Sequence, residues 1–193
     1  MDPTLVPISR FLSLVLRHNP GVIGLELDSA GWADVNELVQ RASAHGRPLS
    51  VDLVRDAVEQ NDKRRFSFSA DGTRVRAVQG HSIPVDLGLE RAAPPATLYH
   101  GTAQRFLDAI RQEGLQPRAR QHVHLSDNAA TAVQVGARHG RPVALQVDSL
   151  GMAAEGFAFF QAENGVWLTA AVPPRFLAVS ESPERRPERP GDE

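Results

Sequence analysis

The feature that most constrains the fold of this chain is a stretch near its middle, from Ile83 to Ala96, that contains three prolines. Pro84, Pro94 and Pro95 interrupt regular backbone hydrogen bonding there, so we expect a linker. Helical spacing of apolar residues dominates before this stretch, and strand-like alternation dominates after it. A chain of 193 residues has room for two lobes with a modest core each. We therefore predict an α+β protein with domains over residues 1–83 and 97–179, joined by a linker over residues 84–96.

The segment before the linker carries the signals of three short helices and a hairpin. Apolar residues recur at helical spacing from Ile8 to Leu16, and the pattern stops before a proline. Asp34 and Ser50 are placed to cap a second and a third helix. Asp71-Gly72 is a strong hairpin turn between two short alternating runs. Three helices followed by a hairpin predict a winged-helix-like lobe.

The segment after the linker mixes strands with helices. We expect a strand that ends at His100-Gly101, followed by a helix that Gly114 closes. Residues 122–125 predict another strand, and Ser126 is placed to cap a helix over residues 129–138. Later apolar residues alternate, which predicts further strands. The pattern indicates a strand-rich α+β lobe.

Composition restricts the kind of site more than the kind of partner. The net charge is −2 and Lys63 is the one lysine among 21 basic residues, so a nucleic-acid site here would be a local arginine cluster. Zero cysteines exclude disulfides and thiolate metal sites. No apolar run approaches the roughly 20 residues of a membrane span, and no signal-peptide pattern is present, so we expect a cytoplasmic protein. The proline- and charge-rich residues 180–193 are expected to be disordered.

Polar residues gather in a few short segments. These segments are Arg17-His18, Lys63-Arg64-Arg65, Gln79 to Ser82, Tyr99 to Thr102, and Arg120 to Ser126. Ordinary explanations exist for the first two, because cations complement the dipole at a helix C-terminus and charge runs often form solvated faces. Taken singly, none of these segments identifies a function.

The histidines of the last two segments leave a zinc site open as an alternative. His122 and His124 alternate along one predicted strand and face the same side, so together with His100 they offer the three nitrogen ligands of a catalytic zinc site. Carboxylates usually orient such ligands. The chain has no Asp or Glu between Glu113 and Asp127, which disfavours the metal.

Taken together, the segments resemble the RNA 2′-phosphotransferases of the tRNA-splicing type. The resemblance runs from about Ile8 to Val179 and rests on six segments in the family's order. They are Ser9 to Pro20, Asn61 to Phe66, Arg76 to Ser82, Tyr99 to Thr102, Arg120 to Ser126 and Glu163 to Thr169. A lone His-Gly-Thr would be a weak signal, whereas six ordered segments are a strong one.

This resemblance implies an N-terminal winged-helix lobe, a C-terminal ADP-ribosyltransferase-like lobe and a site in the cleft between them. The family's catalytic quartet of three arginines and one histidine carries over to Arg17, His18, Arg65 and Arg120. Arg65 is preferred to Arg64 because it immediately precedes the phenylalanine of the family pattern. If a strand starts there, the two arginines also point to opposite faces.

The resemblance also implies a binding site for NAD⁺ and, beside it, residues that contact the RNA phosphate. The residues expected to bind NAD⁺ are His100, Gly101, Thr102, His124, Ser126 and Val166. Among these, Val166 stands where other ADP-ribosyltransferases have a glutamate. Gln79, His81 and Ser82 are expected to line the phosphate or RNA side, and no metal is expected.

The implied activity is the NAD⁺-dependent removal of an internal 2′-phosphate from RNA by a monomeric enzyme that binds no membrane. Two alternatives stay open. One keeps the NAD⁺ chemistry and transfers ADP-ribose to a terminal nucleic-acid phosphate or to a protein, with Glu163, three residues before Val166, as a displaced glutamate. The other is a winged-helix nucleic-acid-binding regulator, which the acidic residues of the predicted helix over residues 50–60 disfavour.

Overall fold

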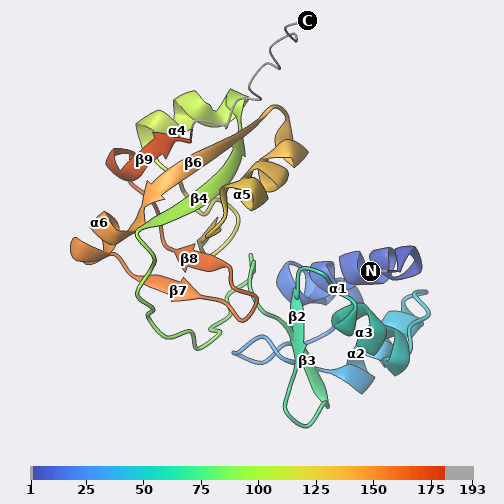
Figure 1. Ribbon diagram of the computed structural model, residues 1–193. Helices are drawn as coiled ribbons and strands as arrows, with labels where there is room; N and C mark the ends of the chain where they lie inside the picture. Colours follow the sequence, from blue (N-terminus) through green and yellow to red (C-terminus); the bar gives the residue numbers. More distant parts are fainter. Residues whose placement is uncertain (1, 181–193) are drawn as a thin grey trace, which may run out of the picture.

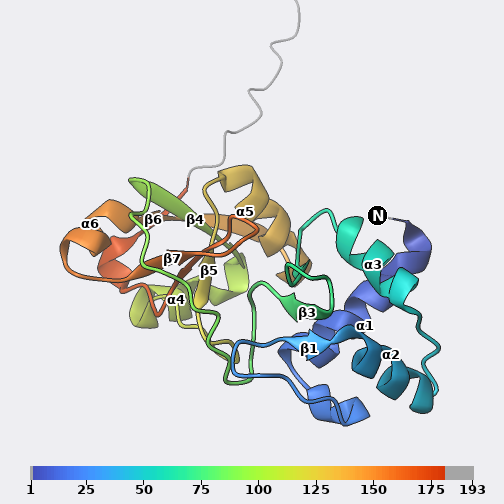
Figure 2. The ribbon, with the colours of Figure 1, turned by 90° about the horizontal axis from the view of Figure 1, so that it is seen from below.

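The structure, a computed structural model, describes residues 2–180 of the chain. Residues 181–193 of the predicted disordered tail lie outside the described residues. The described chain mixes helices with three small antiparallel sheets, each of three strands, which confirms the predicted α+β class. Figures 1 and 2 show residues 2–82, here called the N-terminal part, beside residues 97–180, here called the C-terminal part. Within residues 2–180, no helix is long and apolar enough to cross a membrane.

The N-terminal part contains three helices and one sheet. Its elements are α1 (Val6–Arg17), β1 (Ala33–Asp34), α2 (Val35–Ala44), α3 (Val51–Glu59), β2 (Phe66–Phe68) and β3 (Arg74–Ala77). Asp34 caps α2 by accepting the Glu37 N–H, and Ser50 caps α3 by accepting the Leu53 N–H, as predicted. β2 and β3 form the predicted hairpin, and β1 joins β3 to give the sheet order β1-β3-β2.

One face of each helix in the N-terminal part packs into a common core. The α1 side chains that face this core are fully buried and recur at helical spacing, namely Leu12, Val15 and Leu16. They meet Leu38 of α2 and Val54 of α3. The C-terminal end of α1 is therefore held rigidly where its last residues emerge from the core.

The C-terminal part contains two sheets and three helices. Its elements are β4 (Thr97–Ala103), α4 (Leu107–Glu113), β5 (Val123–Leu125), α5 (Ala129–Gly136), β6 (Pro142–Asp148), α6 (Ser149–Ala154), β7 (Phe159–Gln161), β8 (Trp167–Thr169) and β9 (Leu177–Val179). The strand orders are β4-β6-β9 and β5-β8-β7. A second apolar core, which includes Leu98, Val147, Phe159 and Trp167, holds these sheets together.

Several predicted boundaries in the C-terminal part were wrong. β4 does not end at His100-Gly101 but continues to Ala103, because it pairs with β6 along its whole length. Ser126 does not cap α5; Asn128 does, by accepting the Thr131 N–H, while the Ser126 hydroxyl accepts the Asn128 N–H. α5 ends at Gly136 and a 3₁₀ turn follows it, so the observed α-helix is shorter than predicted.

Two glycines allow α5 to pack directly on β4. A Cβ on Gly101 would lie 1.8 Å from the carbonyl oxygen of Ala132 in α5. A Cβ on Gly136 would lie 2.3 Å from the carbonyl oxygen of Thr102 in β4. The two backbones approach so closely that only glycine fits at either position. Gly101 therefore has a packing role whatever else it does.

We expect Gly101→Ala to destabilise the fold by about 3 kcal/mol, because the added methyl group forces α5 away from β4. Urea unfolding of the variant would measure this loss. Gly21→Ala is the matched control, since a Cβ there makes only an ordinary contact of 3.5 Å. Equal stability of the two variants would contradict the packing role.

Candidate functional site

Backbone hydrogen bonds bring three distant segments together. The Ser82 N–H donates to the Arg17 carbonyl at the end of α1, over 2.9 Å. On the neighbouring residue, the His81 carbonyl accepts the Gln121 N–H over 3.1 Å. The loop after β3 therefore lies between the end of α1 and the loop before β5. Three of the segments singled out in the sequence meet at this point.

Arg17 emerges from the core at the last position of α1 and is 8% exposed. Its Nη2 donates to the Arg65 carbonyl over 3.2 Å, and its guanidinium group lies 5.7 Å from the centre of the Phe66 ring. Gly80, whose φ of 89° favours glycine, lies directly beside this side chain. The buried Nε of Arg17 has no hydrogen-bond partner among the described residues. Such a donor indicates a place for an acceptor from a ligand or water.

Arg65 is held to α1 through Asn61. The buried Asn61 side chain donates to the Ser9 hydroxyl of α1 over 3.0 Å and accepts the Arg65 N–H over 3.3 Å. Arg65 is half-buried directly before β2, whereas Arg64 is exposed and has φ of 42°. Of the two arginines, Arg65 is the one in position to share a site with Arg17.

Arg120 and two histidines form the opposite side of the site. Arg120 Nη1 lies 3.4 Å from His124 Nδ1, and since arginine only donates, His124 Nδ1 is the acceptor. His100 Nδ1 donates to the His124 carbonyl over 3.0 Å, which leaves the His100 Nε2 available. The buried Nε2 of His124 has no partner within residues 2–180. This pair of imidazoles thus presents free nitrogens beside an arginine.

The charged groups of the site repel one another. Burial, Arg65 and Arg120 lower the pKa of Arg17 to about 10. Burial lowers the pKa of Arg120, and burial with Arg138 lowers the pKa of Arg65, an effect that Asp62 opposes. Cations that lower each other's pKa in a partly buried place stabilise an anion bound between them.

His18 follows Arg17 and contacts Ser82. His18 Nδ1 lies 2.9 Å from the Ser82 hydroxyl, which is also 3.4 Å from the Arg17 carbonyl. Burial, Arg17 and Arg120 lower the pKa of His18, so its neutral form prevails at neutral pH. A neutral imidazole keeps one unprotonated ring nitrogen and one N–H, so it can accept and donate hydrogen bonds beside Arg17 and Arg120.

The remaining residues predicted for the phosphate or RNA side differ in access. Gln79 is half-buried, whereas His81 is 2% exposed, and neither ring nitrogen of His81 has a partner among the described residues. Burial, Arg17, His18 and Arg76 lower the pKa of His81 to about 4. His81 is thus buried close to Arg17, His18 and Arg76, and Ser82 is exposed beside His18.

The remaining residues predicted for NAD⁺ lie on strands or beside them. Thr102 is buried in β4, and Ser126 pairs with Tyr99 of the same strand through both backbone hydrogen bonds. Val166 is half-buried in the turn between β7 and β8. Of the predicted set, His100 and His124 contact each other. The Val166 N–H donates to the Asn164 side chain within its own turn.

No group of three or more His, Cys, Asp or Glu side chains within residues 2–180 is arranged to hold a metal ion. His100 and His124 are instead engaged with a carbonyl and with Arg120. His122 packs edge-on against the Phe160 ring, with centroids 5.9 Å apart. The zinc alternative therefore gains no support from the geometry.

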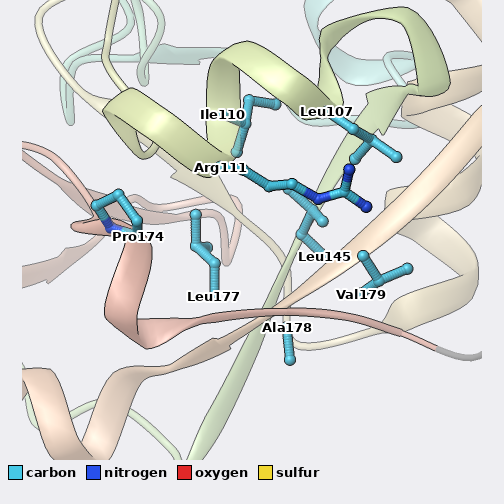
Figure 3. A pocket seen from close by; sticks show the side chains of 8 residues that line it. All are labelled: Leu107, Ile110, Arg111, Leu145, Pro174, Leu177, Ala178 and Val179. Carbon is cyan, nitrogen blue, oxygen red and sulfur yellow. The ribbon is translucent and has the colours of Figure 1, made fainter.

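A pocket of about 270 Å³ lies elsewhere in the C-terminal part, where α4 faces β9 (Figure 3). It is lined by Leu107, Ile110, Arg111, Leu145, Pro174, Leu177, Ala178 and Val179. Its lining is apolar apart from one guanidinium group and includes none of the residues predicted from the sequence. It offers little to a phosphate, so the arginine cluster is the better candidate site.

Two further groups near the arginines have no role in the sequence-based prediction. Arg138, in the 3₁₀ turn after α5, lies close enough to lower the pKa values of Lys63 and Arg65. Asn61 belongs to a segment that carries the resemblance, but its bond to Ser9 spans 52 positions in sequence. Neither contact leaves a local signal, because both depend on how the chain folds back on itself.

Comparison with known proteins gives a consistent result. A family model described as "RNA 2′-phosphotransferase, Tpt1 / KptA family" matches residues 3–171. A protein of Pseudomonas aeruginosa (strain UCBPP-PA14) named "Probable RNA 2′-phosphotransferase" is 56% identical over 175 residues, which cover 90% of this chain and 96% of that protein. Proteins with the same name from Pectobacterium carotovorum and Acaryochloris marina are 53% and 49% identical, over 88% and 94% of this chain and 92% and 100% of their own lengths.

The buried His81 predicts a pH dependence of stability. Its pKa is about 4 in the folded chain and about 6.5 in an unfolded one, so the unfolded state binds more protons as the pH falls between these values. The free energy of unfolding is therefore expected to decrease on acidification. Between about pH 7 and pH 4.5, we expect the free energy of unfolding of the wild type to fall by about 2 kcal/mol more than that of His81→Gln. Urea unfolding at both pH values measures this difference. Equal losses in the two proteins would contradict this contribution.

Proposed function

This chain belongs to the RNA 2′-phosphotransferase family of transferases, and we propose that it removes an internal 2′-phosphate from RNA while consuming NAD⁺. The observation that carries the proposal is the cluster of Arg17, Arg65 and Arg120, drawn from three segments that backbone hydrogen bonds hold together. A 2′-phosphate brings up to two negative charges at neutral pH, and guanidinium groups bind such a group bidentately.

We propose that the two parts of the chain supply different functions. Residues 1–83 would form a winged-helix-like lobe that holds the phosphate, and residues 97–179 an ADP-ribosyltransferase-like lobe that holds NAD⁺, with residues 84–96 as the linker. The hairpin of β2 and β3 after three helices supports the first assignment. The free nitrogens of His100 and His124, beside Arg120, support the second.

In the first step, the RNA 2′-phosphate attacks C1″ of the nicotinamide ribose. The bond from C1″ to nicotinamide breaks, nicotinamide leaves, and the RNA carries an ADP-ribosylated 2′-phosphate. The phosphate has a second pKa of roughly 6, so it attacks as an anion and requires positioning more than deprotonation. Arg17 and Arg65 would bind it from the N-terminal part, and Arg120 from the C-terminal part.

In the second step, the ribose 2″-hydroxyl attacks the phosphorus. The bond from phosphorus to the RNA 2′-oxygen breaks, which releases RNA with a 2′-hydroxyl and ADP-ribose 1″,2″-cyclic phosphate. The arginines offset the charge that develops on the phosphoryl oxygens. We assign the proton movement to His18: its neutral imidazole takes the proton of the attacking hydroxyl and passes it to the leaving 2′-oxygen.

We assign the residues that would bind NAD⁺ from the family pattern and from their free polar groups. His100, Gly101, Thr102, His124, Ser126 and Val166 would hold NAD⁺, and Gln79 and Ser82 would lie toward the RNA. His81 is buried close to Arg17, so it would support the phosphate-binding residues without touching the RNA. We further propose that the physiological substrate is a splice-junction RNA, such as a tRNA, and that the enzyme acts as a cytoplasmic monomer.

Protein ADP-ribosylation is disfavoured by the place of Glu163. Glu163 accepts a hydrogen bond from Arg76 over 2.5 Å, in the turn before Val166, and is therefore already paired with a cation. The regulator alternative is disfavoured by α3, whose Asp52, Asp56 and Glu59 are exposed beside a single Arg55. An acidic helix surface repels a nucleic-acid backbone.

The decisive experiment incubates the purified protein with NAD⁺ and a short RNA that bears one internal 2′-phosphate. Mass analysis then identifies the products. We expect RNA lighter by one phosphate group, together with nicotinamide and ADP-ribose cyclic phosphate. RNA that retains an added ADP-ribose would indicate an enzyme specialised for phosphate ADP-ribosylation. RNA that remains unchanged, with NAD⁺ intact, would exclude the proposed reaction.

The neighbouring arginines offer a matched test of the phosphate site. We expect Arg65→Ala to lower kcat by about 10²- to 10³-fold, because it removes a charged donor that stabilises the transition state. Arg64→Ala removes the same charge from an exposed position and is expected to change kcat by less than about threefold. Rates are measured with saturating NAD⁺ and RNA. The assignment is wrong if Arg64→Ala is the more damaging of the two.

A further inference from the structure

We propose that Arg76 and Glu163 are positioning residues that hold the two parts of the chain at the spacing needed for the arginines to meet one phosphate. This inference rests on the proposed function. It assigns a role to one arginine and one glutamate that lie outside the catalytic quartet. Arg76 lies on β3 of the N-terminal part, and Glu163 lies in the turn between β7 and β8 of the C-terminal part.

Arg76 is aimed at the C-terminal part by its own sheet. β3 is the central strand of the β1-β3-β2 sheet, where Val75 and Ala77 face the core and Arg76 faces outward. The guanidinium group lies 4.4 Å from the centre of the Trp32 ring, at the entrance to β1. This cation–π contact restricts the side chain, which is 15% exposed. The Arg76 side chain therefore reaches Glu163 in a restricted conformation.

The turn between β7 and β8 contacts the N-terminal part at two points, one at Arg76 and one at Lys63. Glu163 Oε1 accepts from Arg76 Nη2 over 2.5 Å. The next residue, Asn164, donates from Nδ2 to the Lys63 carbonyl over 3.1 Å. In Figure 1 the loop that joins β7 to β8 extends toward β2 and β3. Two contacts from adjacent residues fix an orientation as well as a distance.

Both anchor points connect rigidly to the arginine cluster. On one side, the Val78 N–H donates to the Arg65 carbonyl over 3.0 Å, so the end of β3 and Arg65 move together. On the other side, β8 pairs with β5, which places Leu168 opposite His124, the neighbour of Arg120. A change in spacing at Arg76 and Glu163 would therefore change the distance between Arg65 and Arg120.

The charges explain why this pair consists of an arginine and a glutamate. Arg76 lies near enough to the site to lower the pKa of His81, as Arg17 and His18 also do. Another unpaired cation there would add to the repulsion among the arginines. Glu163 neutralises Arg76 at the boundary between the two parts, where the Glu163 side chain remains 44% exposed to solvent.

The test compares Arg76→Gln, Glu163→Gln and the charge-swapped double variant Arg76→Glu with Glu163→Arg. Glu155→Gln is the matched control, because Glu155 also accepts from an arginine over 2.5 Å, but within the C-terminal part. Steady-state rates are measured with RNA that bears an internal 2′-phosphate, at saturating NAD⁺. Urea unfolding of each variant is measured in parallel.

We expect each single variant to lower kcat/KM by about tenfold and to raise KM for the RNA, because misplaced arginines bind the phosphate less well. The charge-swapped variant should recover part of this loss, because it restores the ion pair but not the contact with Trp32, and Glu155→Gln should resemble wild type. A loss in kcat alone, with KM unchanged and stability reduced, would overturn the proposal, since it indicates fewer folded molecules. A loss confined to Arg76→Gln, with Glu163→Gln active, would also overturn it, since it indicates direct RNA contact by Arg76.

A spacing measurement tests the inference even if the enzyme proves inactive on this RNA. The chain has no cysteine, so spin labels can be attached at Asp52→Cys and Asp108→Cys, whose side chains are each 90% exposed in different parts of the chain. We expect a narrow distance distribution that broadens on Arg76→Gln and stays narrow on Glu155→Gln. An unchanged distribution would overturn the positioning role, whereas absence of phosphate removal by wild type would overturn the proposed function alone.

Discussion

The site depends on two backbone hydrogen bonds that flank the peptide from His81 to Ser82, one from Ser82 to the Arg17 carbonyl and one from Gln121 to the His81 carbonyl. They hold three loops side by side without using any charged side chain. The arginines are therefore free to converge, although burial, together with Arg65 and Arg120, lowers the pKa of Arg17 to about 10 and costs stability. A backbone scaffold can support such a cluster because its own bonds are independent of the charges that it presents.

Signals confined to a few residues allowed most of the N-terminal part to be predicted from the sequence. Asp34 and Ser50 cap their helices because each side chain bonds to a backbone group three residues away. Arg65 was distinguished from Arg64 by its position before Phe66, and the structure places Arg65 half-buried while Arg64 is exposed. The roles assigned to the quartet and to the NAD⁺ residues remain predictions, because they depend on ligands.

Features that depend on tertiary pairing were not predicted. β7 and β9 contain three residues each, too few for a clear alternation, and they exist because neighbouring strands pair with them. Ser126 has the right residue type for a cap, but its backbone is taken by Tyr99 of β4, so the cap falls to Asn128. The contact between Arg76 and Glu163 joins positions 87 residues apart, and no local pattern marks such a pair.

The pairing of Glu163 with Arg76 connects the charge of the site with the proposed chemistry. A transferase that modifies a weak nucleophile benefits from a carboxylate that activates it, whereas a phosphate anion requires none and would be repelled by one. In the proposed site assignment Val166, rather than a carboxylate, would stand at the corresponding position, and the nearby Glu163 is bound to Arg76. The arginine cluster thus keeps its positive charge for the substrate, while the one glutamate of this turn stabilises the arrangement of the two parts around it.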